Sequence, residues 1–126
     1  MSMQALKAIA QGMNELQIPY EFSTWTQDII YPYFVGEYQE SEPLNEDGLQ
    51  ETTFLLTGFT RGNWLELEEA KKKIANYFNK VSSKTVIAED GTAVAIFYAS
   101  ALIVPTGDAE LKRIQINLTI KEWSVN

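Results

Sequence analysis

The sequence contains no cysteine and no histidine, and these two absences exclude much of common enzyme chemistry. Without cysteine the chain has no disulfide, no thiolate nucleophile and no cysteine zinc site, which fits a reducing compartment such as the cytosol. Without histidine it lacks the side chain that most often acts as a general base near neutral pH and most often binds transition metals. Triads of the Ser-His-Asp or Cys-His type therefore cannot form. We expect a non-catalytic protein with no metal site and no cofactor.

Basic residues and long apolar runs are also scarce. Lys and Arg number 10 against 17 Asp and Glu, for a formal net charge of −7. This charge excludes the basic face with which most proteins bind nucleic acid, although it suits a protein past which DNA moves without sticking. The longest apolar stretch, residues 93–104, is too short to cross a bilayer, and residues 1–16 lack the apolar run of a signal peptide. We expect a soluble protein without a membrane partner.

Two stretches have the periodicity of amphipathic helices. A chain of 126 residues, 45% of them hydrophobic, can form one domain over residues 1–126. Residues 3–16 place apolar side chains at helical spacing and predict a first helix that ends before Pro19. Asn63, with Glu66 three residues later, predicts the N-cap of a second helix that runs to about Val81. On that helix the spacing of four residues predicts ion pairs of Glu68 with Lys72 and of Glu69 with Lys73.

The remaining segments have the composition of strands. Residues 29–39 and 49–60 predict a long β-hairpin with a flexible acidic loop, and Pro32 marks an edge strand or a strand start. Residues 85–88 and 92–104 predict two more strands, and the alternation over 114–121 predicts a last strand with one face on the core. Within 92–104 the alternation places the alanines on one face, which we expect to lie under a helix. The predicted fold class is α+β, an antiparallel sheet with two helices packed on one face.

No segment has the pattern of a catalytic or ligand site. The acidic loop residues lack the register of a calcium loop, and the glycines around Arg61 lack the pattern of a phosphate loop. Aromatic residues are dense between Tyr20 and Tyr38, and they predict that both faces of the hairpin strand are covered, by a loop of the same chain or by another subunit. Arg61 is either structural or paired with an acid of a neighbouring subunit. Our candidate interface consists of Glu40, Glu42, Leu44, Glu46, Asp47, Leu49 and Arg61.

The order of these elements resembles that of the tail-terminator and head-to-tail joining (neck) proteins of long-tailed bacteriophages and prophages. The resemblance covers most of the chain. It rests on the first helix, the aromatic segment Pro32 to Glu37, the variable loop, the strand that ends at Thr60-Arg61, the Trp64-x-x-Leu67-x-x-Ala70 helix and the closing strands. These are structural patterns and not catalytic signatures.

The resemblance implies a non-catalytic virion structural protein without a cofactor. Such proteins assemble into a closed ring, usually a hexamer, that caps the tail tube and docks to the head connector while DNA passes through an acidic lumen. It also implies assembly in the host cytoplasm, a final place at the head–tail interface of the virion, and a loop from Glu40 to Leu49 that orders on assembly. The alternative is a small α+β binding or regulatory module, such as an immunity or adaptor protein. Under the first hypothesis, charge reversal at Arg61 should impair assembly more than folding.

Overall fold

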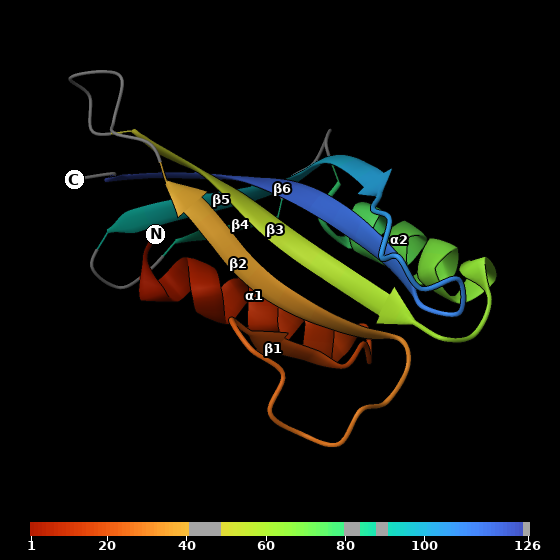
Figure 1. Ribbon diagram of the computed structural model, residues 1–126. Coiled ribbons are helices and arrows are strands. Elements are labelled where there is room, and N and C mark those ends of the chain that lie inside the picture. The colour runs from red at the N-terminus through yellow and green to blue at the C-terminus, as the bar shows by residue number, and fades with distance from the viewer. Residues whose placement is uncertain (41–48, 80–83, 88–90, 125–126) are drawn as a thin grey trace.

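The computed structural model describes residues 1–40, 49–79, 84–87 and 91–124. These residues form two helices and one sheet of strand order β1-β2-β3-β6-β5-β4, which confirms the predicted α+β class (Figure 1). The elements are α1 (Met3–Glu15), β1 (Tyr20–Phe22), β2 (Tyr33–Glu40), β3 (Gln50–Thr60), α2 (Trp64–Tyr77), β4 (Lys84–Ile87), β5 (Thr92–Ile103) and β6 (Lys112–Ser124).

The sheet is mixed, and the prediction of a purely antiparallel sheet was wrong at one edge. β1 runs parallel to β2 over Phe34 to Gly36, whereas all other neighbouring strands are antiparallel. The cause is the tight connection after α1, in which Gln17 has a φ of 59° and the Phe34 N–H donates to the Pro19 carbonyl at 2.9 Å. After α1 the chain therefore runs in the same direction as β2. β1 has only three residues, and so short a strand leaves no sequence pattern that predicts its direction. Pro32 directly precedes β2, which confirms that it marks a strand start.

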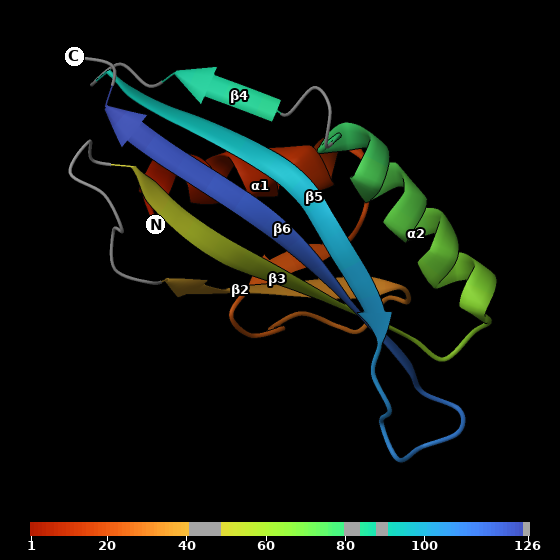
Figure 2. The same cartoon turned by 90° about the horizontal axis from the view of Figure 1, so that it is seen from above.

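Both helices lie on the same side of the sheet, and we call this side the inner face (Figures 1 and 2). The side chains of β3 and β6 alternate, so that one set is buried against the helices and the other set lies on the outer face. The core forms between the helices and the first set, as the sequence alternation predicted. Its largest fully buried members include Ile9, Met13, Phe34, Phe54, Leu56, Leu67, Ile74, Phe78, Ile96, Ile114, Ile116 and Leu118.

The first helix starts at a cap and closely approaches the second. The Ser2 hydroxyl accepts a hydrogen bond from the Ala5 N–H at 3.1 Å, and Ser2 in turn bonds to the buried carboxylate of Glu122 on β6. Near its other end Gly12 faces α2, where an added Cβ would lie 2.7 Å from the ring of Tyr77. Glycine therefore lowers the helix propensity of α1 but allows the two helices to meet.

The second helix begins as predicted but has a different ion pair. Asn63 Oδ1 accepts a hydrogen bond from the Glu66 N–H at 3.3 Å, which confirms the N-cap. Glu66 then uses its carboxylate to accept a bond from the Thr60 hydroxyl at 2.5 Å, which joins the helix start to the end of β3. Among the described residues the ion pair on this helix is Glu68 with Lys71, at 2.6 Å, and not the two predicted pairs. The helix ends at Tyr77, and Val81 lies outside the described residues.

The fifth strand contains a register shift between Tyr98 and Ser100, opposite Leu118 and Asn117. Val94 and Ile96, before the shift, lie on the inner face and point to the core. Ala101 and Ile103, after the shift, lie on the same inner face. Ala93 and Ala95 pair with Trp123 and Lys121 on the outer face, so the expectation that the alanine face lies under a helix was wrong. A β-bulge adds one residue to one strand, and strict alternation in the sequence cannot reveal where this happens.

Candidate interaction surfaces

The loop from Ser23 to Pro32 folds onto the outer face of β2. The Trp25 ring lies 4.8 Å from that of Tyr33, the Tyr31 ring lies 5.8 Å from it, and Phe59 of β3 stacks on Tyr33 at 5.1 Å. Of the two covers considered for the aromatic strand, the structure shows the loop of the same chain over Tyr33, whereas Tyr38 further along the strand is 41% exposed. The loop is held by Glu21, whose carboxylate accepts bonds from the Thr26 hydroxyl and N–H at 2.6 Å, and these bonds lower the pKa of Glu21.

This cluster borders an open groove of about 420 Å³ on the outer face. Trp25, Tyr33 and Phe59 line it, with Glu37 and Arg113 also at its wall. The Arg113 side chain donates to the Pro105 carbonyl at 2.6 Å, so its guanidinium is oriented by backbone. A groove of this kind can hold an apolar side chain.

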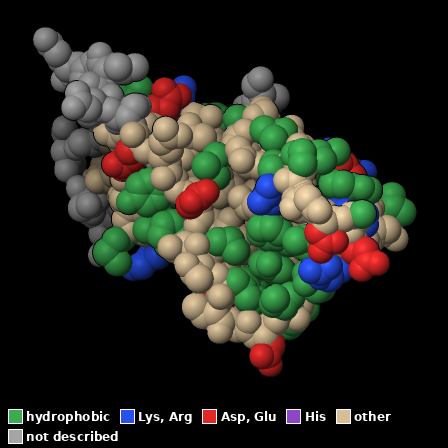
Figure 3. All heavy atoms as spheres, in the orientation of Figure 1, with side chains coloured by type: hydrophobic (Ala, Val, Ile, Leu, Met, Phe, Trp, Pro, Cys, Tyr) green, Lys and Arg blue, Asp and Glu red, His purple; other side chains and the backbone are tan. Residues whose placement is uncertain are grey.

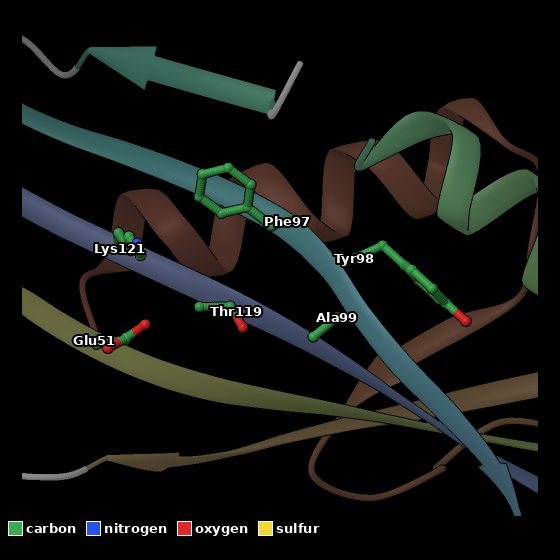
Figure 4. Close-up of a pocket in the computed structure, with 6 residues that line it drawn as sticks. All are labelled: Glu51, Phe97, Tyr98, Ala99, Thr119 and Lys121. Carbon is green, nitrogen blue, oxygen red and sulfur yellow. The ribbon is translucent and has the colours of Figure 1, made fainter. Parts of the chain in front are cut away.

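A second hollow, of about 380 Å³, lies on the outer face over β3, β6 and β5. Figure 4 shows Glu51, Thr119 and Lys121 around it, with the Tyr98 side chain directed toward α2. The Lys121 ammonium lies 5.7 Å from the centre of the Phe97 ring. Lysine over an aromatic ring is a common surface contact, so this hollow has no feature that indicates a substrate.

Exposed apolar side chains gather at the end of the sheet where β3 and β5 finish and β2 and β6 begin. This end holds seven of the eleven large hydrophobic residues that the described part of the chain exposes. We call the set the apolar end, and it is visible as hydrophobic surface at the right of Figure 3. Its members are Ile29, Ile30, Tyr31, Trp64, Leu65, Leu102 and Ile103.

A single ion pair connects the parts of the apolar end. Arg61 contacts the Tyr31 hydroxyl on one side and donates to the Asp108 carboxylate at 3.2 Å on the other, and both contacts raise its pKa. Asp108 has its pKa lowered, first by the Glu110 N–H at 3.0 Å and then by Arg61. Trp64, Ile103 and Asp108 line one open groove of about 350 Å³, so the helix, the β5 end and the turn after it form one surface.

Those predicted interface residues that the structure describes lie at the two opposite ends of β3. Glu42, Leu44, Glu46 and Asp47 lie outside the described residues. Glu40 is exposed on β2 and pairs with the amino group of Met1, and Leu49 is half-buried just before β3. Arg61 follows the other end of β3, which spans roughly 35 Å over its residues. We predicted that Arg61 is either structural or paired with an acid of a neighbouring subunit. In the structure Arg61 pairs with Asp108 of its own chain.

Sequence reasoning did not identify the apolar end. Its residues come from a loop, a helix start and a strand end, and each contributes only two or three of them. Two signals were present, because Ile29 and Ile30 are adjacent in a loop and Leu65 is off the buried stripe of α2. Scattered surface leucines and isoleucines are normal, so only the folded arrangement shows that these residues meet.

Two further observations concern the described residues. No three acidic side chains in this part of the chain converge as a metal site. None of the helices described is long and apolar enough to cross a membrane. A scan against models of known protein families finds no match, and a search of curated proteins finds no similar sequence.

Proposed function

We propose that the protein is a non-catalytic structural component of a phage or prophage virion, a ring-forming tail terminator or head-to-tail joining protein. The observation that supports this proposal is the apolar end. Large exposed apolar patches on small domains mark protein interaction sites, because their burial against a partner removes apolar surface from water. An acidic chain with such a patch has the properties needed to bind protein while DNA passes close by.

In this proposal the apolar end contacts another protein of the virion, either a further copy, the tail tube or the head connector. Trp64 at the start of α2 is the central contact, since aromatic side chains near an arginine are typical of protein interfaces, and the exposed Leu65 beside it extends the apolar area. The exposed Arg61–Asp108 pair lies between the parts of this surface. The acidic residues of the hairpin loop, from Glu42 to Asp47, stay a predicted second contact.

The test compares two matched charge insertions. Leu65 is 67% exposed at the apolar end and Ile87 is 68% exposed on β4, so glutamate at either position buries no charge in the free protein. Wild-type protein and the Ile87→Glu variant should form rings or bind the ends of purified tail tubes, by sedimentation and electron microscopy. Leu65→Glu should do neither, although its melting temperature stays that of the wild type. A wild-type protein that remains monomeric and ignores tube ends would overturn the proposal.

The alternative, a small binding or regulatory module, is favoured by a different observation. The outer groove beside Trp25, Tyr33 and Phe59 has an aromatic wall and an oriented Arg113, which could hold an apolar peptide side chain. Under this alternative, Phe59→Ala would abolish binding of a protein partner, whereas Leu65→Glu would leave it unchanged.

A further inference from the structure

We infer that copies of the chain join head to tail by strand pairing, with the free half of β2 from one copy beside the free half of β5 from the next. This inference rests on the proposed function in one respect, since both require the chain to associate with itself. Beyond the proposed function, the inference specifies which two strands pair, in which relative direction and in which register.

Among the described residues, two edge segments of the sheet have no neighbouring strand, and they lie at diagonally opposite corners. β4 pairs with β5 only over Ala93 to Ile96, and β1 pairs with β2 only over Phe34 to Gly36. On β5 the Tyr98 N–H donates to the Phe78 carbonyl at 2.6 Å, and no described strand lies beside the following residues up to Ile103. On β2 all four residues from Glu37 to Glu40 are exposed. Each segment offers backbone N–H and C=O groups to an added strand.

The β5 segment also lacks the devices that protect edge strands. Natural edges carry charged residues, proline or a covering element, which prevent pairing with another chain. From Ala99 to Ile103 the sequence contains no charged residue and no proline, and its last two residues, Leu102 and Ile103, are 48% and 60% exposed. A segment of this composition at an edge indicates a position that a strand occupies in the assembled state.

Helix α2 extends past this edge and provides a surface beneath the missing strand. Figure 2 shows α2 beyond β5, with no strand in front of it. The flank of α2 that carries Glu66 and Lys73 faces the connection between α1 and β1, because these residues line a groove with Ile18. The opposite flank, with Trp64 and Lys71, therefore lies under the free edge, and Trp64 borders the same groove as Ile103.

The β2 segment of a second copy fits this position in one register. Its free residues start after Gly36, where β1 ends, and the first of them on the inner face is Tyr38. Ile103 also lies on the inner face, so we place Ile103 opposite Tyr38 and Leu102 opposite Gln39. Tyr38 is 41% exposed and stacks at 6.0 Å on Phe22, which is 42% exposed. This register buries all three apolar side chains, Ile103, Tyr38 and Phe22, on the inner face. The pairing length of about four residues equals that of the β4–β5 pair within the chain.

The two strands differ, so the contact is heterologous and its repetition produces a ring or a filament. Within one sheet Leu102 is level with Val35, through Gln115 and Thr57. Pairing Leu102 with Gln39 therefore shifts each copy by four residues, about 13 Å along the strands. A shift of this kind tilts the strands, which a closed ring of strands requires.

A cross-linking experiment tests the strands and the register together. The chain has no cysteine, so Leu102→Cys and Gln39→Cys are each the sole thiol of their protein. The two positions lie on the outer face, and directly opposite residues of an antiparallel pair have Cβ atoms about 4.5–5.5 Å apart, close to the reach of a disulfide. Mild oxidation of the mixed variants should give a covalent dimer about tenfold more abundant than from either variant alone. The matched control mixes Gln39→Cys with Ala101→Cys, whose side chain points to the other face and should not react.

The outcomes separate this inference from the proposed function. Rings without the specific cross-link, or a dimer from Leu102→Cys alone, would overturn the β2–β5 pairing and leave the proposed function intact. A wild-type protein that stays monomeric even with tail tubes would overturn both. As a second measurement, Ile103→Lys should weaken self-association about tenfold or more without a change in melting temperature, whereas Ile87→Lys on β4 should not. Equal association of both lysine variants with the wild type would also overturn the pairing.

Discussion

Replacing Gly58 by alanine is expected to destabilise the protein through a single contact. Gly58 lies near the end of β3, directly opposite Phe34 of β2, and the Phe34 ring covers it. A Cβ at this position would lie 2.4 Å and 2.5 Å from two carbons of that ring. Phe34 is fully buried, so the ring cannot move into solvent.

Two opposing terms determine the magnitude for Gly58→Ala. Overpacking a core costs about 1–3 kcal/mol. Alanine also restricts the unfolded chain more than glycine does, which returns about 0.4–1 kcal/mol. The net loss is about 1–2 kcal/mol, and for a domain of this size each kcal/mol lowers the melting temperature by about 4 °C.

A double-mutant cycle with Phe34→Leu isolates the contact. Phe34→Leu alone costs about 1–2 kcal/mol because it leaves a cavity. Together with Gly58→Ala it should cost at least about 1 kcal/mol less than the sum, because the added methyl group fills that cavity. The free energies come from urea unfolding of the four proteins. If the two costs add within about 0.5 kcal/mol, or if Gly58→Ala is as stable as the wild type, the close approach of Phe34 does not determine the need for glycine.

Three further predictions follow from local contacts. Asn63→Ala should lower the free energy of unfolding by about 1 kcal/mol through loss of the α2 cap, whereas serine at the same position should retain the stability, and equal values for both would contradict the cap. Arg61→Gln should raise the pKa of Asp108 part of the way to its ordinary value in an NMR titration, since the Glu110 N–H remains, and an unchanged pKa would refute the ion pair. Burial and the Glu15 carboxylate raise the pKa of Tyr77 to about 12. Its stabilisation is complete below the ordinary pKa of about 10 and is lost as pH rises toward 12, so Tyr77→Phe should make the alkaline loss of stability shallower, and parallel curves would exclude this contribution.

The sequence predicted those elements whose determinants are local. The cap at Asn63 and the alternation of β6 act within a few residues, and both appear in the structure as expected. The parallel direction of β1 depends instead on how the turn after α1 meets Phe34, a contact across the fold. The bulge after Tyr98 depends on the partner strand. Neither leaves a periodic signal in the sequence.

The candidate surface was less predictable than the fold for a physical reason. Arg61 was identified from its place between a strand and a helix, but its acid, Asp108, lies 47 residues away in the chain. The apolar end unites residues that are each unremarkable alone, such as Leu65 and Ile103. An interface depends on which residues lie close together on the folded surface. Hydrophobic periodicity predicts only which residues are buried.

The extra residue in β5 determines which face of the sheet each later residue of the strand occupies. Ala99 has no partner opposite it on β6, so its deletion would keep Ala101 and Ile103 on their present side of the sheet. Loss of Ala101, a paired residue of the same strand, would instead move Leu102 opposite Ile116 and turn it toward the helices. The strand therefore absorbs a change of length at the bulge, and the bulge separates the part that closes the core from the part that ends in the exposed Leu102 and Ile103.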